Sequence, residues 1–129
     1  MVIRERLALE ARRQLLHTDA TAAVVGHALG FNGALKTAVD NGADCVYIGL
    51  RDDTNARNFA GLNFDAAQAG EGVRYAHARG AKVLLAINTY PQAGEHVRWT
   101  RAVDTAVALG VDAVILADPG LMRYARTRH

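Results

Sequence analysis

The sequence predicts an α/β fold, a right-handed array of parallel strands alternating with helices, preceded by a helical extension. Three segments share one pattern: a glycine, a short polar step and a continuous apolar run. They occupy residues 42–50, 80–88 and 110–118, so their first glycines lie 38 and 30 residues apart. That spacing is about the length of one strand–helix unit. Helical patterns fill the intervals, and the alternation predicts parallel strands joined by right-handed crossovers.

The apolar runs predict the strands. CVYIGL, KVLLAI and AVILA are rich in β-branched residues and do not alternate with polar ones. Continuous apolar runs are typical of strands that are buried on both faces, as in parallel sheets. We therefore expect each of the three strands to be covered on both sides.

The helices between the strands are predicted from spacing and end signals. Trp99, Ala102, Val103, Ala106 and Val107 recur on one helix face, and Gly110 follows as a stop. A shorter stripe of the same kind consists of Leu35, Ala38 and Val39 and is closed by Asn41-Gly42.

Two further helices have start signals. Asp65 is a suitable N-cap for a helix over 65–78, although Gly70 and Gly72 each weaken a helix by about 1 kcal/mol relative to alanine. Asp118-Pro119 is typical of a cap followed by proline in the first turn, which predicts a helix over 120–128.

Residues 1–31 do not continue this rhythm. RERLALEARRQLLHTD predicts an amphipathic helix, and ATAAVVGHALGF predicts a shorter helix that ends in a glycine turn. Residues 22–30 also fit the place of a first strand, although their alanine content favours a helix. The predicted organisation is a helical extension over 1–31 followed by one α/β domain over 32–129.

Composition limits the class of protein. Half of the 129 residues are hydrophobic and 22% are charged, which is typical of a soluble globular chain. No apolar run is long enough to span a membrane, and no secretory signal is readable. The single cysteine, Cys45, lies in a strand-like run, which favours a buried, inert thiol in the reducing cytoplasm.

Charge is distributed unevenly along the chain. Residues 1–17 contain four Arg and two Glu, and residues 121–129 contain three Arg. Residues 18–120 contain eight Lys or Arg against eleven Asp or Glu. Because the central body is acidic and carries no continuous basic run, nucleic-acid binding is not expected from the charge pattern.

Polar residues at the ends of the predicted strands form the candidate site. In parallel α/β folds the carboxyl ends of the strands carry the site. The candidate residues are Asp52, Asp53, Asn55, Arg57 and Asn58 after the first strand, Asn88 and Thr89 after the second, and Asp118 after the third. They offer carboxylates, amides and a guanidinium for a polar substrate, a metal or a partner.

Each candidate also has a structural interpretation. Adjacent Asp, Thr and Asn residues often form turn hydrogen bonds, and Arg57 is within reach of Asp52 or Asp53 for an ion pair. Asn88 could close its strand, and Asp118 could simply cap a helix. The five histidines show no metal-ligand spacing, and Trp99 is expected in the core.

Residues 34–126 resemble the collagenase-like peptidase family. The resemblance is carried by RDDTNARNFAGLNF, AINT and RWTRAVD, in this order and at fitting spacing. Within the family they are most similar to the UbiU-like branch, which acts in oxygen-independent ubiquinone biosynthesis. The resemblance implies a partial TIM-barrel-like domain that holds only the first strands and helices of the barrel.

The resemblance also implies chemistry that depends on residues outside this stretch. UbiU-like proteins hydroxylate a quinone precursor, bind a 4Fe-4S cluster through four cysteines and work with a UbiV-like partner. The cluster ligands lie beyond the matched region, so no cofactor is expected in this chain, and activity of the chain alone is not expected. A peptidase-family hydrolase is the alternative, although no nucleophile–base pair is readable.

Residues 6–31 resemble a different family, the AraC-type transcription regulators. The segment RLALEARRQLLHTDATAAVVGHALGF is similar to part of their helix-turn-helix, but the recognition helix that would follow near Asn32 is replaced. A DNA-binding module is therefore a third and weaker hypothesis. Because a short parallel sheet leaves open edges, we also expect self-association of the chain.

Overall fold

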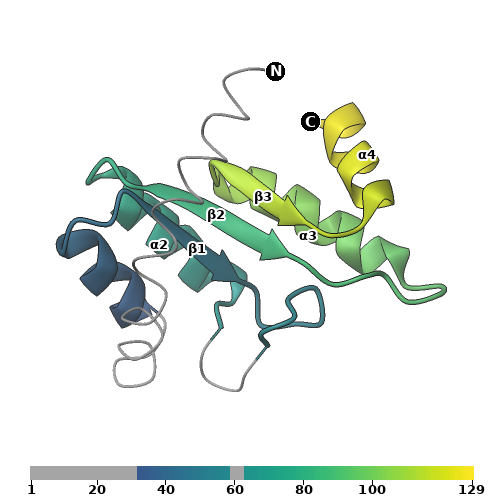
Figure 1. The fold of residues 1–129 in the computed structure, drawn as a ribbon, viewed down its shortest axis with the longest axis horizontal. Coiled ribbons are helices and arrows are strands. Elements are labelled where there is room, and N and C mark those ends of the chain that lie inside the picture. Colours follow the sequence, from purple (N-terminus) through teal and green to yellow (C-terminus); the bar gives the residue numbers. More distant parts are fainter. Residues whose placement is uncertain (1–31, 59–62) are drawn as a thin grey trace.

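The computed structural model describes residues 32–58 and 63–129. A helix over 32–40 opens this part of the chain. It is followed by β1 (Cys45–Gly49), α2 (Ala66–His77), β2 (Lys82–Ile87), α3 (His96–Leu109), β3 (Ala113–Leu116) and α4 (Pro119–Arg128) (Figure 1). The predicted extension over 1–31, including the helix-or-strand choice at 22–30, lies outside the described residues.

The three strands form one parallel sheet in the order β1-β2-β3. Tyr47 pairs with Leu84, and Leu84 pairs with Ala113. Each predicted strand is present: β2 spans its whole apolar run, and β1 and β3 each end one residue before the end of theirs. The α/β class, the parallel direction and the alternation with helices are therefore confirmed for the described residues.

The hydrophobic core lies on one face of the sheet. Side chains alternate along a strand, so Ile48, Leu85 and Val114, which are register partners, point to the same side. In Figure 1 the helices α2 and α3 lie behind the sheet, and their apolar faces pack on this side. The buried residues of the core are Leu35, Val39, Ile48, Leu50, Phe64, Val73, Val83, Leu85, Ile87, Trp99, Val103 and Leu121.

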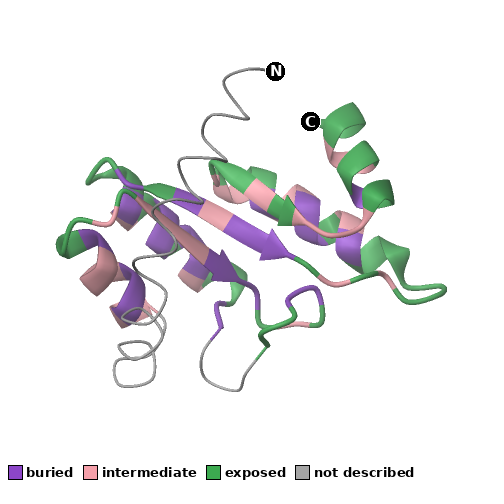
Figure 2. Cartoon of the chain, in the orientation of Figure 1, coloured by how far each residue is buried: buried purple, intermediate pink, exposed green. Residues whose placement is uncertain are grey.

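The opposite face of the sheet carries Tyr47, Leu84, Ala113 and Ile115, and we call it the open face. Ala113 is exposed and Ile115 is 38% exposed, while Tyr47 and Leu84 are half-buried (Figure 2). The prediction that all strands are buried on both faces is therefore wrong for β3 and for the first half of β1. Among the described residues, the helices α2 and α3 that pack on the sheet cover only one side of it.

Helix α2 begins where the sequence predicts. The Asp65 side chain accepts a hydrogen bond from the Gln68 backbone at 2.8 Å, and the Gln68 side chain accepts one from the Asp65 backbone at 3.1 Å. This reciprocal pair is a capping box. Gly72 is needed for packing, because a Cβ there would lie 2.9 Å from Leu35 Cδ1 on the helix over 32–40.

Replacing Asp65 with alanine should therefore destabilise the fold by about 1 kcal/mol. The backbone N–H of Gln68 loses its acceptor, and the reciprocal bond from the backbone N–H of residue 65 to the Gln68 side chain loses the contact that orients it. Urea unfolding followed by circular dichroism measures the loss. Asp65→Ser is the matched control, because serine keeps a capping oxygen and should cost about half as much or less. Equal losses for the two variants would contradict the capping role.

Helices α3 and α4 also have the predicted ends. Gly110 ends α3 in the left-handed conformation, with φ of 74°. Asp118 caps α4, accepting a hydrogen bond from the Leu121 backbone at 2.8 Å, and Pro119 occupies the first turn. Tyr124 on α4 donates to Asp104 on α3 at 3.0 Å, which joins the two helices.

Asp112 links α2, β2 and β3 at the amino ends of the strands. Its carboxylate accepts hydrogen bonds from the Val83 backbone at 2.8 Å, from His77 Nε2 at 2.8 Å and from Lys82 Nζ at 3.2 Å. Partial burial pushes the pKa of Asp112 upward. The bond from Val83, followed by those from His77 and Lys82, outweighs burial and holds the pKa below its ordinary value.

Because the pKa of Asp112 is lower in the folded state than in the unfolded state, its stabilising contribution is present above the unfolded value near 4 and is lost as pH falls through the folded value. Asp112→Asn should lower stability at neutral pH by about 1 kcal/mol, because solvent screens a partly exposed carboxylate. The variant should also unfold with a weaker dependence on acid below pH about 5. Chemical unfolding between pH 3 and 7 measures both effects, with Glu95→Gln as an exposed control; identical acid profiles would contradict the assignment.

The environment of Cys45 differs from the buried one that the sequence predicts. It is half-buried and stands outside the core, on the same side of the sheet as Lys82. Burial, and then the negative charge of Asp112, raises the pKa of the Cys45 thiol. The thiol is therefore protonated and unreactive at neutral pH, which agrees with an inert role although not with full burial.

No helix among the described residues is long and apolar enough to cross a membrane.

Candidate functional site

Polar loops meet at the carboxyl ends of β1 and β2, and we call residues 50–58 and 88–95 together the rim. Thr89 Oγ1 donates to the Asp53 carbonyl at 2.6 Å, and the Ala56 backbone donates to Asn88 Oδ1 at 2.8 Å. The prediction that the polar residues after these two strands lie together is confirmed.

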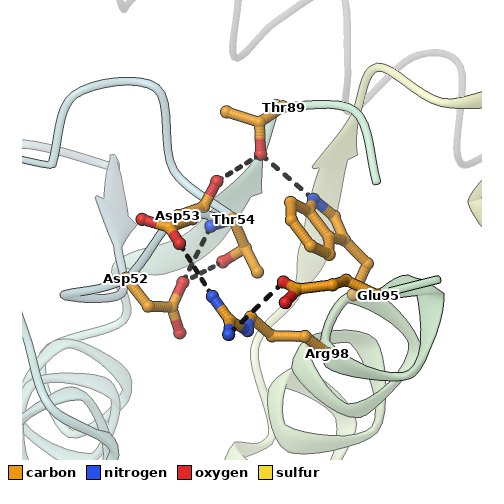
Figure 3. A network of polar contacts seen from close by, with 7 residues as sticks. Asp52, Asp53, Thr54, Thr89, Glu95 and Arg98 are labelled. Carbon is orange, nitrogen blue, oxygen red and sulfur yellow. Dashed lines mark hydrogen bonds and ion pairs between the residues drawn. The ribbon is translucent and has the colours of Figure 1, made fainter. Parts of the chain in front are cut away.

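Asp52 forms a local turn. Its Oδ1 accepts hydrogen bonds from the Thr54 backbone at 2.9 Å and from Thr54 Oγ1 at 2.5 Å (Figure 3). Thr54 is fully buried. Asp52 therefore has the structural role that adjacent Asp and Thr residues often have, since it satisfies the polar groups of a buried threonine.

Asp53 belongs to a chain of contacts between the loops and α3. Its Oδ2 lies 2.7 Å from Arg98 Nη1, and Arg98 also pairs with Glu95 at 3.4 Å (Figure 3). The Asp53 carboxylate is exposed, so the ion pair contributes little to stability. Its effect is to orient the first turn of α3 against the loop that follows β1.

Trp99, on α3, joins the same network of hydrogen bonds. It is 2% exposed, and its indole N–H donates to Thr89 Oγ1 at 3.0 Å. The sequence interpretation placed Trp99 in the core, which is confirmed, but it missed the hydrogen bond and the rim partners Glu95 and Arg98. Their sequence signal is positional: the first turn of a helix that follows a parallel strand begins at the rim.

Asn55 is buried against a glycine. A Cβ built on Gly49, at the end of β1, would overlap the side-chain amide of Asn55. The Asn55 Oδ1 accepts a hydrogen bond from the Arg57 backbone at 3.2 Å. Gly49 therefore leaves the space in which the loop folds back over the end of the strand.

Arg57 pairs with neither aspartate that the sequence suggested. Its Nη1 donates to the Tyr47 hydroxyl at 2.8 Å, while Asp53 pairs with Arg98 and Asp52 bonds to Thr54. The predicted ion pair between Arg57 and Asp52 or Asp53 is therefore wrong. The fold brings Arg98, 45 residues away in sequence from Asp53, closer to that carboxylate than the neighbouring arginine.

Two other predicted residues lie apart from these contacts. Asn58 is exposed beside the residues that the structure does not describe. Asp118 caps α4, and no hydrogen bond or ion pair joins it to the rim among residues 32–58 and 63–129. The helix-capping interpretation of Asp118 is the one that the geometry bears out.

Arg51 stabilises the base of the loop. Its guanidinium donates to the Asn63 carbonyl at 3.0 Å and to Gln68 Oε1 at 3.1 Å. Arg51 also pairs through its backbone with Phe64, which lies beside Leu50 in a short parallel bridge. Both acceptors of the guanidinium are neutral, and the residue closes the loop onto α2.

The rim offers hydrogen-bonding groups rather than a metal site. Within the described ranges, no group of three His, Cys, Asp or Glu side chains could hold a metal ion. Two of the described histidines lie away from the rim: His77 bonds Asp112 and His129 bonds Asp104, each at 2.8 Å. The third, His96, is exposed at the start of α3, next to the rim. The site can therefore position a polar or charged group by hydrogen bonds.

The chain belongs to peptidase family U32, whose model matches residues 30–129. Over 91 residues it is 42% identical to an uncharacterized protease of Methanocaldococcus jannaschii, covering 70% of this chain and 22% of that relative. It is 37% identical over 91 residues to tRNA hydroxylation protein P of Helicobacter pylori strain 26695, covering 70% and 21% respectively. The protein of the same name in Escherichia coli K12 is 32% identical over 97 residues, covering 71% of this chain and 20% of the relative.

The chain thus spans about a fifth of the length of these relatives. No solved structure matches it significantly. The resemblance to the collagenase-like peptidase family is confirmed at the level of the family. The resemblance of residues 6–31 to AraC-type regulators stays a prediction, because this segment lies outside the described residues and almost wholly outside the family match.

Proposed function

We propose that this chain contributes the rim of a U32 protein that acts in hydroxylation, with transfer RNA as the substrate. The observation that carries the proposal is the 32–37% identity to relatives named tRNA hydroxylation protein P over 70% of the chain. A continuous stretch of that length necessarily includes β1, α2 and β2. It therefore includes the first loop of the rim, 50–58, and at least residues 88–91 of the second.

The geometry of the rim supports a positioning role. Asn88 and Thr89 hold the two loops together through hydrogen bonds, and Asn55 holds the first loop in shape, so the polar side chains around them are fixed before a substrate binds. Preorganised groups lose less entropy when they bind a ligand. The described residues would orient the substrate.

A four-iron cluster does not fit this chain alone. Such clusters take four cysteine thiolates, and Cys45 is the one cysteine in the sequence. It lies at the start of β1, at the opposite end of the strand from the rim. These residues therefore cannot hold such a cluster by themselves.

A quinone precursor is the second candidate substrate. The stretches RDDTNARNFAGLNF, AINT and RWTRAVD resemble the branch of the family that acts in oxygen-independent ubiquinone biosynthesis, together with a UbiV-like partner. Peptide hydrolysis is a third candidate, supported by the family description and by the relative named a protease.

One experiment separates the three candidates. The gene is deleted in the organism that encodes it, and tRNA nucleosides, the quinone pool and peptidase activity are measured by mass spectrometry and peptide cleavage. We expect hydroxylated nucleosides to disappear and to return when the wild-type gene is restored. Unchanged nucleosides would reject the proposal; a loss of quinone without oxygen, or of peptide cleavage, would then identify the alternative.

We also infer that the sheet is the first part of a TIM-barrel-like array. Three parallel strands in sequential order, joined by helices on one face, match successive strand–helix units of such a barrel, and the open face would become its interior. The exposed apolar side chains of β3 favour self-association when the chain is isolated. Sedimentation of the 129-residue chain should show dimers or larger species, and a monodisperse monomer would contradict the expected self-association.

A further inference from the structure

Three arginines lie at or beside the rim, and they differ in their partners. Arg98 is neutralised by Asp53 and Glu95, and Arg51 is held by the Asn63 carbonyl and Gln68. Arg57 is exposed, and its recorded side-chain partner among the described residues is the Tyr47 hydroxyl, which carries no charge. Arg51 and Arg57 thus both lack an acidic partner among the described residues, but two acceptors engage the Arg51 guanidinium, whereas the Arg57 guanidinium bonds to one hydroxyl.

The position of Arg57 is set by two hydrogen bonds that its own and the preceding backbone N–H groups donate. Its own N–H donates to the buried Asn55 side chain, and the preceding N–H, of Ala56, donates to Asn88 across the rim. The guanidinium reaches Tyr47, which stands on the open face of the sheet beside Leu84. The cation therefore lies where the rim meets the open face.

We propose that Arg57, held by Tyr47, binds a phosphate group of the RNA substrate at this edge. A guanidinium presents five N–H donors in a planar fork that matches phosphate oxygens, and the bond to Tyr47 uses one of the two terminal nitrogens. The hydroxyl limits the rotation of the side chain, so less entropy is lost when a phosphate binds. The inference rests on the proposed function, since the relatives' names point to RNA as the anion.

The test measures binding of tRNA to the 129-residue chain by fluorescence anisotropy at salt concentrations between about 50 and 200 mM. Arg57→Gln should weaken binding several-fold and make the plot of log affinity against log salt shallower by about 0.7–0.9, the loss of one phosphate contact. Arg57→Lys should keep most of this slope but bind more weakly than wild type, because an ammonium lacks the planar fork. Tyr47→Phe should weaken binding with the slope unchanged, because the cation remains but is less ordered.

Arg74→Gln is the matched control. Arg74 is an exposed arginine near the end of α2, on the side of the domain away from the rim, and its removal should leave the slope unchanged. Because Arg57 is exposed, Arg57→Gln should also leave urea unfolding within about 0.5 kcal/mol of wild type. Equal effects of Arg57→Gln and Arg74→Gln, or no tRNA binding by the wild-type chain at low salt, would overturn the inference.

Binding and hydroxylation are measured separately, so the two proposals can fail independently. If tRNA binds through Arg57 while deletion of the gene leaves tRNA nucleosides unchanged, the phosphate contact stands and the proposed function fails. If deletion removes the hydroxylated nucleosides but Arg57→Gln binds tRNA with the wild-type salt slope, the proposed function stands and the contact is rejected.

Discussion

Replacing Trp99 with alanine is expected to lower the free energy of unfolding by about 3–5 kcal/mol, the range for a large aromatic removed from a core. Trp99 is 2% exposed and packs between α3 and the sheet. Its loss also removes the donor to Thr89, which holds the Asp53 carbonyl. Since domains of this size are stable by only about 5–15 kcal/mol, this loss removes a large share of the total stability.

Trp99→Phe separates packing from hydrogen bonding. Phenylalanine keeps most of the buried apolar area and cannot donate to Thr89, so the expected loss is about 1–2 kcal/mol. Val97→Ala is the control on the same helix, because Val97 is 65% exposed and should cost less than about 0.5 kcal/mol. Urea unfolding followed by circular dichroism measures all three variants, and equal losses for Trp99→Ala and Val97→Ala would contradict the burial of Trp99.

Replacing Gly49 with alanine is expected to destabilise the chain by about 2–3 kcal/mol, the range for overpacking a close-packed site. The added Cβ would overlap the Asn55 amide, which is itself 6% exposed and has little room to move. Displacing Asn55 would also break its bond to the Arg57 backbone. The loop should then separate from the end of β1, and tRNA binding should weaken together with stability.

A double-mutant cycle shows whether Asn55 is the cause. Asn55→Ala removes the atoms that obstruct the new Cβ, so the two substitutions combined should cost less than the sum of the single losses. Gly70→Ala is the control for a buried glycine. Its Cβ would lie 3.3 Å from a flexible Leu109 methyl, and the gain in helix propensity of about 1 kcal/mol should offset the contact. Additive losses for Gly49→Ala and Asn55→Ala would contradict the overlap.

Much of the fold could be predicted from local signals. Asp65 and Asp118 were recognisable as helix caps, and Gly110 as a helix stop, because each depends on hydrogen bonds or backbone angles within a few residues. The parallel order of the strands followed from their alternation with helices. The meeting of the loops after β1 and β2 followed in turn, because parallel strands end at the same edge.

Partners within the rim could not be predicted in the same way. Asp53 lies four residues from Arg57 in the sequence, yet it pairs with Arg98 on α3. The angle at which α3 packs on the sheet decides that pairing, and this angle depends on the whole core around Trp99. The burial of the strands could not be predicted from the sequence either. An apolar run predicts a strand, but it does not show whether helices cover one face of that strand or both.

The sequence by itself determined the α/β class, the order of strands and helices, their caps and the edge at which polar residues collect. Each of these depends on interactions between near neighbours or on the strand–helix alternation. Only the tertiary structure decided that Asn88 accepts a hydrogen bond from the Ala56 backbone, that Arg57 lies beside Tyr47, and that Tyr47, Leu84, Ala113 and Ile115 form an open face. Those outcomes depend on contacts between distant residues, which form only when the packed core brings the elements together.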